Sequence, residues 1–504
     1  MLRSRPQIAP PSRLRLIRAL HSSSRVDGTL GLRAEDPART WERRAPLTPS
    51  ACARLVKEQH TVLVERSPKR VFSDGEYEQA GAQLTDTLDA RRCDIVVGVK
   101  EPLRSNLPVA PSTTHVAFFH CHKGQAYNLP LLRRLLASRS RVIDYELLTD
   151  GDGPGAKRTT GFGRLAGFSG MADGLSALGT KILAARGVAT PFLTLPRPLQ
   201  AGTVARMEEW LRDVGKEIER NGTAREAGPI VITLSGRGQV GEGARQALNQ
   251  LPVKWIEAHE LQRTVQDPAT DLRQIYACHL ELGDYLVSHD GQPFDRERYR
   301  KHPDVFTSVF HEKVELSVIT EVVEADLSLP KIAPFTTLFL NGGFFAPGCP
   351  RLLSTEQLAQ LQRCAENHLL SIVDVSCDFG GGLEFVTTPT TLDNPNVQFD
   401  AATGSLHRDP SRPTSTQLSS IEILPSALPR DATEQFSTSV LPYIRALLEG
   451  ASSTASSGPL LAALERATLA SGGKLEKKHE WLHGLLEGGV AEPQRKKAVV
   501  LGAG

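Results

Sequence analysis

Short apolar runs alternate with amphipathic stretches over the first third of the chain. Between residues 27 and 146, runs rich in β-branched residues are bounded by turn or charged residues, a pattern typical of buried strands. The segment between the last two runs places Leu129, Leu132 and Leu136 on one helical face. This alternation predicts a mostly parallel sheet covered on both faces by helices. The predicted strands are 60–65, 94–99, 115–119 and 141–146.

A second α/β region follows two long predicted helices. One is the Ala-rich stretch 170–186, and the other covers 205–222, where apolar side chains recur every three or four positions until Asn221-Gly222. Residues 262–335 are mostly polar and show no clear period. We therefore expect an α/β protein with two Rossmann-like, doubly wound domains. The predicted strands of the second region are 229–234, 253–258, 336–341 and 369–375.

The two ends of the chain differ from the rest in composition. Residues 1–26 hold six Arg, no Lys and no acid, and they end in a Ser cluster. This composition is typical of a mitochondrial transit peptide, with a disordered basic tail as the alternative. The last residues, KKAVVLGAG at 496–504, are an apolar strand with a Gly-x-Gly. They predict the truncated start of a further nucleotide-binding unit, with a chance strand as the alternative.

Charge and cysteine content narrow the function classes. Without the six arginines of the arm, 53 of the 59 basic residues remain against 57 acidic ones, a net charge of -4. A nucleic-acid-binding body is therefore disfavoured. The seven scattered cysteines form no C-x-x-C pair, which favours free thiols in a reducing compartment such as the mitochondrial matrix, or the cytoplasm as the alternative. No apolar run approaches the ~18 residues of a membrane-spanning helix.

A glycine-rich turn follows the strand at 229–234. Gly236, Gly238 and Gly241 have the G-x-G-x-x-G spacing, in which the glycines allow a tight turn, backbone approach to a pyrophosphate, and helix packing on the strand. A further strand ends in Glu257, 21 residues after Gly236, where an acid would meet a ribose hydroxyl. The predicted cofactor-binding residues are Gly236, Arg237, Gly238, Gln239, Val240, Gly241 and Glu257.

The choice between NADP(H) and NAD(H) stays open at this stage. The Glu257 carboxylate would repel a 2′-phosphate and so favours NAD(H). Arg237 favours NADP(H) if its guanidinium reaches that phosphate. Charge alone does not decide between them.

Polar side chains follow the predicted strands of the first domain, where open α/β sheets bind ligands. Lys100 ends one strand and His120 the next, so the two are candidates for proton transfer at a shared edge. A solvated lysine and a hydrogen-bonded surface histidine are the structural alternative. We predict no metal site at His120-Cys121-His122, because neighbours in an extended segment point to opposite faces and no third ligand is evident.

Nine motifs, over roughly residues 29–445, stand in the order found in lysine-ketoglutarate reductase. The chain therefore resembles this enzyme, the N-terminal half of a bifunctional enzyme whose second half is a saccharopine dehydrogenase. The motifs are WERRAPLTP, GVKEP, FFHCHKGQ, VIDYELL, GFGRLAGFSGM, the glycine loop, IAPFTTLFLNG, VDVSCDFGGGLEF and SIEILPSALPRDAT.

The resemblance implies a fold, a reaction and site residues. The fold is that of alanine dehydrogenase and transhydrogenase, in which the last part of the chain returns to the first domain. The reaction is the reductive condensation of L-lysine with 2-oxoglutarate to saccharopine by NADPH, with Lys100 and His120 matching the acid/base pair. Lys157 is an alternative to Arg158, and the two aspartates could equally be structural caps. The positions that match substrate contacts are Arg44, Gln125, Glu146, Arg158, Asp374 and Asp378.

The resemblance also implies a division of the chain. We expect a transit peptide, a substrate domain, a linking helix, a dinucleotide-binding domain, a return segment, a linker with a helix, and the start of a C-terminal saccharopine dehydrogenase domain. An insertion of unassigned role is expected at 311–331. The expected bounds are 1–26, 27–200, 201–227, 228–385, 386–450, 451–495 and 496–504.

Two other functions stay open. One is an NAD-dependent, lysine-forming saccharopine dehydrogenase, and the other is a non-catalytic regulatory domain of a bifunctional enzyme. The expected partners are lysine, 2-oxoglutarate, saccharopine and the covalently linked C-terminal domain, without nucleic acid or membrane. A homo-oligomer is neither predicted nor excluded.

Overall fold

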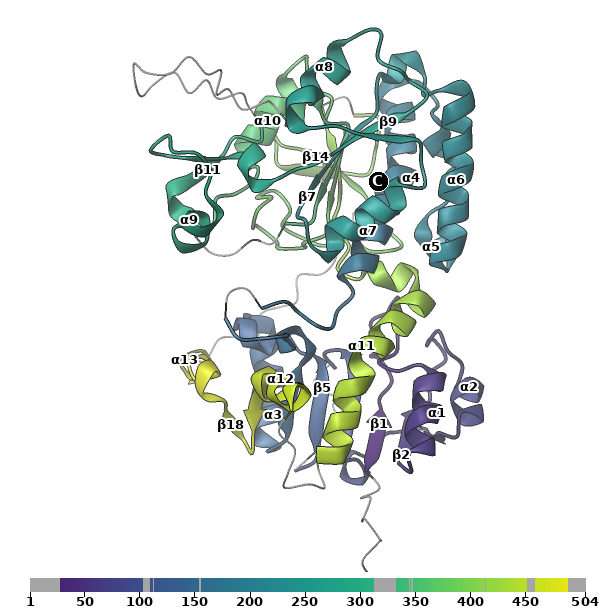
Figure 1. Cartoon of the computed structure of the whole chain (residues 1–504), viewed down its shortest axis with the longest axis vertical. Helices are drawn as coiled ribbons and strands as arrows, with labels where there is room; N and C mark the ends of the chain where they lie inside the picture. The colour runs from purple at the N-terminus through teal and green to yellow at the C-terminus, as the bar shows by residue number, and fades with distance from the viewer. Residues whose placement is uncertain are drawn as a thin grey trace, which may run out of the picture.

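The protein consists of two α/β domains, stacked one above the other in Figure 1. The structure is a computed structural model. The predicted transit peptide 1–26 and the predicted third unit 496–504 lie outside the described residues, as does the 311–331 insertion beyond its first residue. The structure describes residues 28–102, 109–111, 113–153, 156–311, 332–343, 345, 348–412, 414–450 and 458–487.

The first domain is built on one sheet, which has eight strands among the described residues in the order β18-β17-β6-β5-β4-β1-β2-β3. The run from β6 to β3 is parallel, and β17 and β18 are added antiparallel at the β6 edge. The strands are β1 (Thr29–Leu32), β2 (Thr61–Glu65), β3 (Gln83–Thr85), β4 (Ile95–Lys100), β5 (Thr114–Phe118), β6 (Arg141–Asp144), β17 (Thr468–Ser471) and β18 (Lys474–Leu475). The helices are α1 (Pro49–Lys57), α2 (Asp74–Gln79), α3 (Leu129–Ala137), α11 (Pro429–Gly450), α12 (Pro459–Ala467) and α13 (Leu482–Glu487).

The second domain has its own sheet, with eight described strands in the order β15-β14-β16-β13-β12-β7-β9-β8. The run from β16 to β8 is parallel, whereas β14 and β15 pair antiparallel. The strands are β7 (Val231–Ser235), β8 (Val253–Trp255), β9 (Ile275–His279), β12 (Leu338–Asn341), β13 (Ser371–Asp374), β14 (Val397–Asp400), β15 (Ser405–His407) and β16 (Thr416–Ser419). The helices are α4 (Gly163–Arg186), α5 (Pro198–Ala201), α6 (Val204–Asn221), α7 (Gln239–Leu248), α8 (Leu261–Gln266) and α10 (Thr355–Arg363). An excursion after β9 adds β10 (Leu286–Ser288), α9 (Arg296–Lys301) and β11 (Phe306–Ser308), of which the strands form a two-stranded sheet.

Both faces of the second sheet are covered, which explains why its strands are apolar throughout. Leu338 and Leu340 face the core shared with α4, α6 and α7, while Phe339 between them faces the core shared with α8 and α10. Figure 1 shows α4, α6 and α7 together on one side of the sheet. The predicted Rossmann-like α/β class is confirmed. Among the described residues, no helix combines the length and apolar character that a membrane crossing requires.

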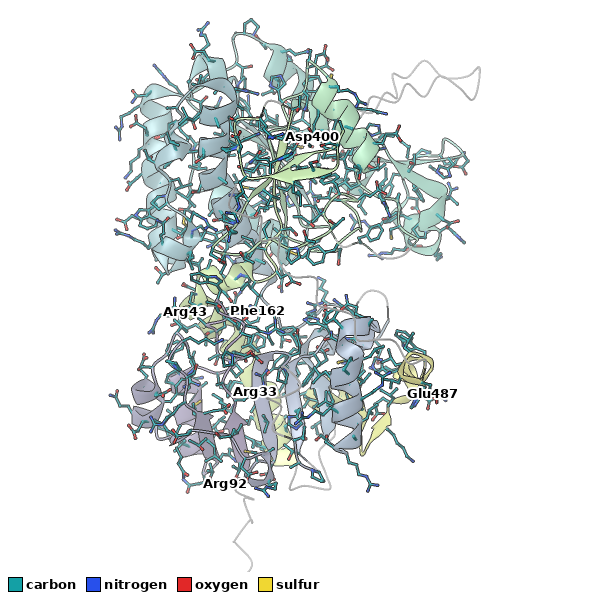
Figure 2. The ribbon with its side chains drawn as sticks, turned by 180° about the vertical axis from the view of Figure 1, so that it is seen from behind. Arg33, Arg43, Arg92, Phe162, Asp400 and Glu487 are labelled. Carbon is teal, nitrogen blue, oxygen red and sulfur yellow. The ribbon has the colours of Figure 1, made fainter. Side chains whose placement is uncertain are left out.

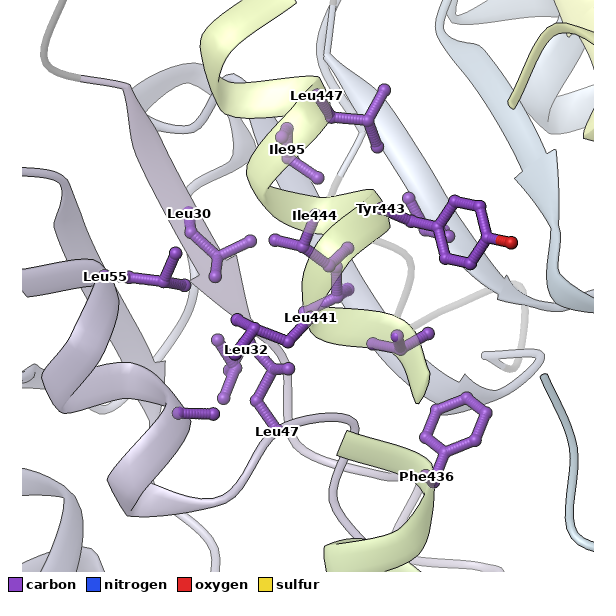
Figure 3. Packing of buried hydrophobic residues seen from close by; sticks show 14 of the residues in the cluster. Leu30, Leu32, Leu47, Leu55, Ile95, Phe436, Leu441, Tyr443, Ile444 and Leu447 are labelled. Carbon is purple, nitrogen blue, oxygen red and sulfur yellow. The ribbon is translucent and has the colours of Figure 1, made fainter. Parts of the chain in front are cut away.

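Helix α11 returns the chain to the first domain. Its apolar side chains Phe436, Val440, Ile444 and Leu448 recur every four residues and are fully buried. They pack in one core with the central strand β1 and with α1, as Figure 3 shows for Leu30, Leu32 and Leu55 beside the helix. Burial of such side chains stabilises the domain by about 1.5–3 kcal/mol each. The first domain therefore needs residues from both ends of the chain.

Two helices of the second domain approach each other closely enough to require glycine. A Cβ atom on Gly167 of α4 would lie 1.8 Å from the Val240 carbonyl oxygen of α7. A Cβ atom on Gly243 of α7 would lie equally close, 1.8 Å, to the Arg164 carbonyl oxygen of α4. The two glycines therefore place α7, which starts in the glycine loop, directly against the helix that follows the domain crossing.

The structure differs from the sequence expectations in several elements. Strands β1 and β9 were not predicted, although each lies inside its sheet. The predicted strand 141–146 ends at Asp144, and Tyr145–Leu147 form a 3-10 turn. On α3 the buried face includes Leu131 and Leu135 rather than Leu136.

The boundaries of the two domains also lie elsewhere than expected. Helix α4, expected within the substrate domain 27–200, packs in the core of the second domain. Strands β14 to β16, expected in the return segment 386–450, belong to the second sheet. The described part of 451–495 contains β17 and β18 in addition to helices, and these strands extend the first sheet.

We predict that Gly167→Ala lowers the free energy of unfolding by about 1–3 kcal/mol, because the new methyl group overlaps backbone that cannot rotate away. Gly75→Ala in α2 is the matched control. A Cβ there meets no described atom within 4 Å, and we expect a change of less than about 1 kcal/mol in the stabilising direction. Urea denaturation of both variants measures the difference, and equal stability of the two would contradict the prediction.

Candidate active site

Lys100 and His120 come from neighbouring strands. Lys100 ends β4 and pairs in register with Phe118 of β5, and His120 follows β5 by two residues. Both side chains act electrostatically on the buried carboxylate of Glu101. The two predicted acid/base residues therefore share one edge of the first sheet.

The backbone at Lys100 forms hydrogen bonds to a buried acid, Glu35. The Glu35 carboxylate accepts hydrogen bonds from the N–H groups of Val99 at 2.6 Å and Lys100 at 3.1 Å, and the Arg33 guanidinium donates to the Lys100 carbonyl. Burial raises the pKa of Glu35, although Arg33 and the two N–H groups oppose it. Among the described residues, the Lys100 ammonium has no carboxylate within salt-bridge distance, so it is free to meet a ligand.

His120 sits in a strained backbone conformation, with a φ of 56°. Its N–H donates to the Asp144 carboxylate at 2.8 Å, which holds the turn after β5. Its Nδ1 lies 2.8 Å from Oε2 of Glu146. A carboxylate partner of this kind fixes the orientation of the ring and leaves Nε2 for a substrate.

Glu146 is the centre of a charged group that includes one other predicted substrate residue, Arg158. Its Oε1 lies 2.7 Å from the Arg158 guanidinium and 3.1 Å from the Lys123 ammonium, and its Oε2 lies 3.6 Å from Nε2 of His122. Burial alone would raise the pKa of Glu146, but the hydrogen bond and charge of His120, together with Arg158 and Lys123, outweigh burial and lower it well below its usual range. Glu146 is therefore an anion that gathers cationic side chains, rather than a proton donor.

The predicted substrate residues Arg44 and Gln125, and Lys157 as the alternative to Arg158, lie outside this group. The Arg44 side chain is 3% exposed and forms hydrogen bonds of 2.8 and 2.6 Å to Glu42. Gln125 is exposed, and its Oε1 accepts from Tyr127 at 2.9 Å. The backbone N–H of Lys157 donates to the Asp150 carboxylate. Of the two alternatives, Lys157 and Arg158, the side chain that contacts Glu146 is that of Arg158.

An aromatic cluster lies under the site. Phe118, Tyr145, Phe162 and Phe436 are in mutual ring contact, with Phe162 and Phe436 stacked at 4.5 Å. The Arg44 guanidinium lies 4.1 Å from the centre of the Phe162 ring. Phe162 stands where the two domains meet, as Figure 2 shows. The cluster therefore forms an apolar surface beside the strand ends that carry Lys100 and His120, where Phe118 stacks on the His120 ring.

His122, Asp144 and Glu146 place potential metal ligands within 4.8 Å of one another. The two carboxylates lie 22 and 24 residues after His122, so the local sequence around the histidines gave no sign of them. The carboxylate of Asp144 already accepts two backbone N–H groups, and that of Glu146 is paired with Arg158 and Lys123. These contacts disfavour a further cation, and we do not propose a metal here.

The second domain supplies Asp378 to the same group. The charges of Lys123 and Glu146 both act on Asp378, across the boundary between the domains. Burial raises the pKa of Asp378, and its carboxylate accepts from the Phe345 N–H at 3.3 Å. Asp378 follows Cys377, whose φ of 52° marks a second strained position beside the site.

Asp374 is part of a buried polar chain rather than of the charged group. Its carboxylate accepts from Asn341 at 3.0 Å and from the Ser376 hydroxyl at 2.7 Å, and Asn341 in turn accepts from Ser235 at 2.8 Å. Burial raises the pKa of Asp374 to about 6, against the lowering effect of these hydrogen bonds. The chain joins the carboxyl ends of β13, β12 and β7, and Ser235 directly precedes the glycine loop.

The glycine loop has the geometry of a dinucleotide-binding turn. Gly236 has a φ of 82°, and a Cβ on Gly241 would lie 2.2 Å from the Gly236 carbonyl oxygen. No described atom lies within 4 Å of a Cβ on Gly238, so a ligand can approach the backbone there. Gln239 is exposed at the start of α7, while Val240 packs against α4. A pyridine nucleotide fits this loop, because its N–H groups and the α7 N-terminus favour a pyrophosphate.

Arg237 and Glu257 lie on different sides of β9. Arg237 is exposed in the loop after β7, and its Nε lies 2.9 Å from Oε1 of Glu281. Glu257 follows β8, which is separated from β7 by β9. The prediction for Glu257 assumed that β8 is the neighbour of β7. Because β9 lies between them, Glu257 lies one strand farther from the loop than expected.

We predict that Asp374→Asn stabilises the protein at neutral pH. A carboxyl group whose pKa is raised by folding favours the folded state below its usual pKa near 4, and this advantage is lost as the pH rises through about 6. Removing the charge should therefore add up to about 3 kcal/mol at pH 7.5 and little at pH 4. Chemical denaturation at pH 7.5 and at pH 4 measures the change in the free energy of unfolding at each pH.

The control for this prediction is Asp393→Asn. Burial would raise the pKa of Asp393, but hydrogen bonds from Thr391 and Trp41 outweigh burial and lower it overall, so its neutral variant should not gain stability at pH 7.5. A gain for Asp374→Asn of the same size at both pH values would show that its buried charge carries no cost.

Comparisons with known proteins agree with this architecture. The family described as alanine dehydrogenase/PNT, N-terminal domain, matches residues 31–167. A solved structure of L-alanine dehydrogenase superposes with a TM-score of 0.52 at 19% identity, covering 91% of this chain and 99% of that one. The predicted alanine dehydrogenase-type fold is thereby confirmed.

Curated relatives extend the similarity to the whole chain. The mitochondrial alpha-aminoadipic semialdehyde synthase of Mus musculus is 32% identical over 100% of this chain and 53% of its own length. The Arabidopsis thaliana alpha-aminoadipic semialdehyde synthase is 31% identical over 93% of this chain and 42% of its length. The Neurospora crassa saccharopine dehydrogenase [NAD(+), L-lysine-forming] is 28% identical over 83% of this chain and 91% of its length. The chain spans about half the length of the synthases it matches, and it is similar to them over that half, on the fold of alanine dehydrogenase.

Proposed function

We propose that the chain catalyses the NADPH-dependent reductive condensation of L-lysine with 2-oxoglutarate to saccharopine. The observation that carries the proposal is that Lys100, His120 and Glu146 lie at one edge of the first sheet, within electrostatic reach of Asp378 from the domain that holds the glycine loop. The similarity to alpha-aminoadipic semialdehyde synthases supports the same reaction.

The reaction needs a base, an acid and a reductant. The ε-amine of lysine must lose a proton before its nitrogen attacks the keto carbon of 2-oxoglutarate, and the resulting carbinolamine must be protonated to release water. Lys100 and His120 provide two groups for these proton steps. A bound nicotinamide would supply the hydride that reduces the imine carbon, and the imine nitrogen keeps its proton in saccharopine.

The substrate carboxylates need cations at the same edge. Arg158 and Lys123 are half-exposed and differ in this from Arg44, which is buried against Glu42. We assign the carboxylate contacts first to Arg158 and Lys123. An Arg44 contact would require release of its hydrogen bonds to Glu42. Gln125 is assigned as an exposed polar contact at the rim.

The proposed cofactor is NADPH rather than NADH. Glu257 was the sequence argument for NADH, and its place beyond β9 weakens that argument. Arg237, in the loop itself, favours a phosphate on the ribose. The fold and the glycine loop support a pyridine nucleotide as cofactor, whether NADPH or NADH.

The proposal extends to the cellular setting of the chain. The Arg-rich segment 1–26 supports import into the mitochondrial matrix, and the Mus musculus relative is named as mitochondrial, whereas the Arabidopsis thaliana name carries no such word. The closing segment 496–504 supports a covalently linked saccharopine dehydrogenase domain. We propose no oligomeric state.

The second candidate is an NAD-dependent saccharopine dehydrogenase that forms lysine. Its support is the Neurospora crassa relative, which the chain covers almost completely but at the lower identity of 28%. The third candidate is a non-catalytic regulatory domain. The presence of Lys100, His120 and the glycine loop disfavours it, because a domain without catalysis has no chemical need for them.

The proposal predicts that the full chain oxidises NADPH when both lysine and 2-oxoglutarate are present, and more slowly with NADH. The decrease of nicotinamide absorbance measures this directly, with reactions that omit one substrate as controls. No oxidation with either cofactor would refute the enzyme reading, and a clear preference for NADH would favour the second candidate.

A separate prediction concerns the acid/base pair. Lys100→Met and His120→Gln should each lower turnover by about 10²–10⁴-fold, because each removes one proton-transfer group. Cofactor affinity should change less than about twofold, since neither side chain belongs to the loop. Lys57→Met and His259→Gln, at exposed positions away from the site, are matched controls. Equal loss of turnover and cofactor affinity would show that the roles are misassigned.

A further inference from the structure

The strand order of the second sheet changes which acid stands beside the glycine loop. β9, not β8, pairs with β7, in register from Val231 opposite Tyr276 to Leu234 opposite His279. Neighbouring strands lie ~4.8 Å apart, so β8 and the following Glu257 lie about 10 Å from β7. The residues after β9 therefore occupy the place that a ribose-binding acid takes in a dinucleotide fold.

Three contacts join the end of β9 to the loop. Nε2 of His279 lies 3.0 Å from the Gly236 carbonyl oxygen, and the Arg237 guanidinium donates to the His279 carbonyl at 2.5 Å. The same guanidinium lies 2.9 Å from Oε1 of Glu281. Arg237 is thus directed along the end of β9 rather than away into solvent.

A second arginine reaches Glu281 from the excursion after β9. Arg296 begins α9, and its guanidinium lies 3.4 Å from Oε2 of Glu281. Each oxygen of the carboxylate therefore faces a different guanidinium. The three side chains are about half exposed, at 47%, 49% and 57% for Arg237, Glu281 and Arg296. Exposed pairs of this kind are worth ~0–1 kcal/mol, so a stronger anion can replace the carboxylate at little cost.

We propose that Arg237 and Arg296 form the binding site for the 2′-phosphate of NADP(H): Glu281 bridges the two guanidiniums in the absence of ligand, and the phosphate displaces this exposed carboxylate, whose charge would otherwise repel it. The inference rests on the proposed dinucleotide binding and assigns its specificity. A phosphate carries up to two negative charges and three acceptor oxygens, so it can accept several hydrogen bonds from both guanidinium groups. The Glu281 carboxylate makes only one contact with each guanidinium. The excursion β10–α9–β11 thereby contributes to cofactor choice by supplying Arg296.

The test compares two ligands that differ only in the 2′-phosphate. Titration calorimetry of the full chain with 2′,5′-ADP and with 5′-AMP measures the contribution of that group without any turnover. We expect tighter binding of 2′,5′-ADP. Arg237→Gln and Arg296→Gln should each weaken 2′,5′-ADP by about tenfold and leave 5′-AMP within about twofold, because each removes one charge-assisted contact.

Glu257→Gln is the matched control, since the sequence spacing alone would assign the ribose to this residue. Its effect on either ligand should stay within about twofold. Equal affinity of the unmodified chain for the two ligands, or equal loss of both in the arginine variants, would overturn the inference. A larger change in ligand preference for Glu257→Gln than for the arginine variants would overturn it as well.

The experiment separates this inference from the reaction proposed above. Neither ligand reacts, so a chain that binds 2′,5′-ADP through the two arginines but does not oxidise NADPH with lysine and 2-oxoglutarate would refute the reaction and keep the phosphate site. Binding of neither ligand would remove the dinucleotide site and the inference with it. Circular dichroism of each variant verifies that it is folded.

Discussion

The carboxylate of Glu146 holds together side chains from two separate segments of the first domain, the turn after β5 and the loop that carries Arg158. It is largely buried, so it needs partners, and His120, Lys123 and Arg158 provide them. The same charge reaches Asp378 in the second domain. Removal of this carboxylate would leave the cations of Lys123 and Arg158 at one sheet edge without an anionic partner. The His120 ring would also lose the contact that orients it. The site therefore depends on an anion that transfers no proton itself.

Stability and function oppose each other on the second domain. The Ser235–Asn341–Asp374 chain buries a carboxylate at a cost to folding, yet it ties the end of β7 to β13 beneath the glycine loop. A neutral residue would fold more favourably there. Two non-glycine residues with positive φ, His120 and Cys377, flank the site from opposite domains. Two strained positions and a buried charge therefore lie where ligands are expected to bind, as in many active sites.

Much of the fold could be read from the sequence because its strands are apolar and β-branched. β1 escaped prediction because TLGL is only four residues long and contains a glycine, and β9 because polar residues surround it. Lys100 and His120 were found because strand ends are visible in sequence. The hydrogen bonds of Arg44 to Glu42 and the contact of Lys123 with Glu146 depend on side-chain packing that has no sequence signature. Strand order, which moved Glu257 away from the loop, is a property of the assembled sheet.

The return of the chain to the first domain has a consequence for synthesis and folding. The Thr48 backbone N–H donates to the Ser437 hydroxyl, 389 residues later, and the Arg141 guanidinium donates to the Thr468 hydroxyl, 327 residues later. The second domain, in contrast, is nearly continuous and can close its core while the rest is still being made. During translation the first domain must therefore wait, with its β6 edge and the β1 face uncovered, until the last helices emerge. The part that begins first is completed last, which makes it the segment most exposed to aggregation before folding ends.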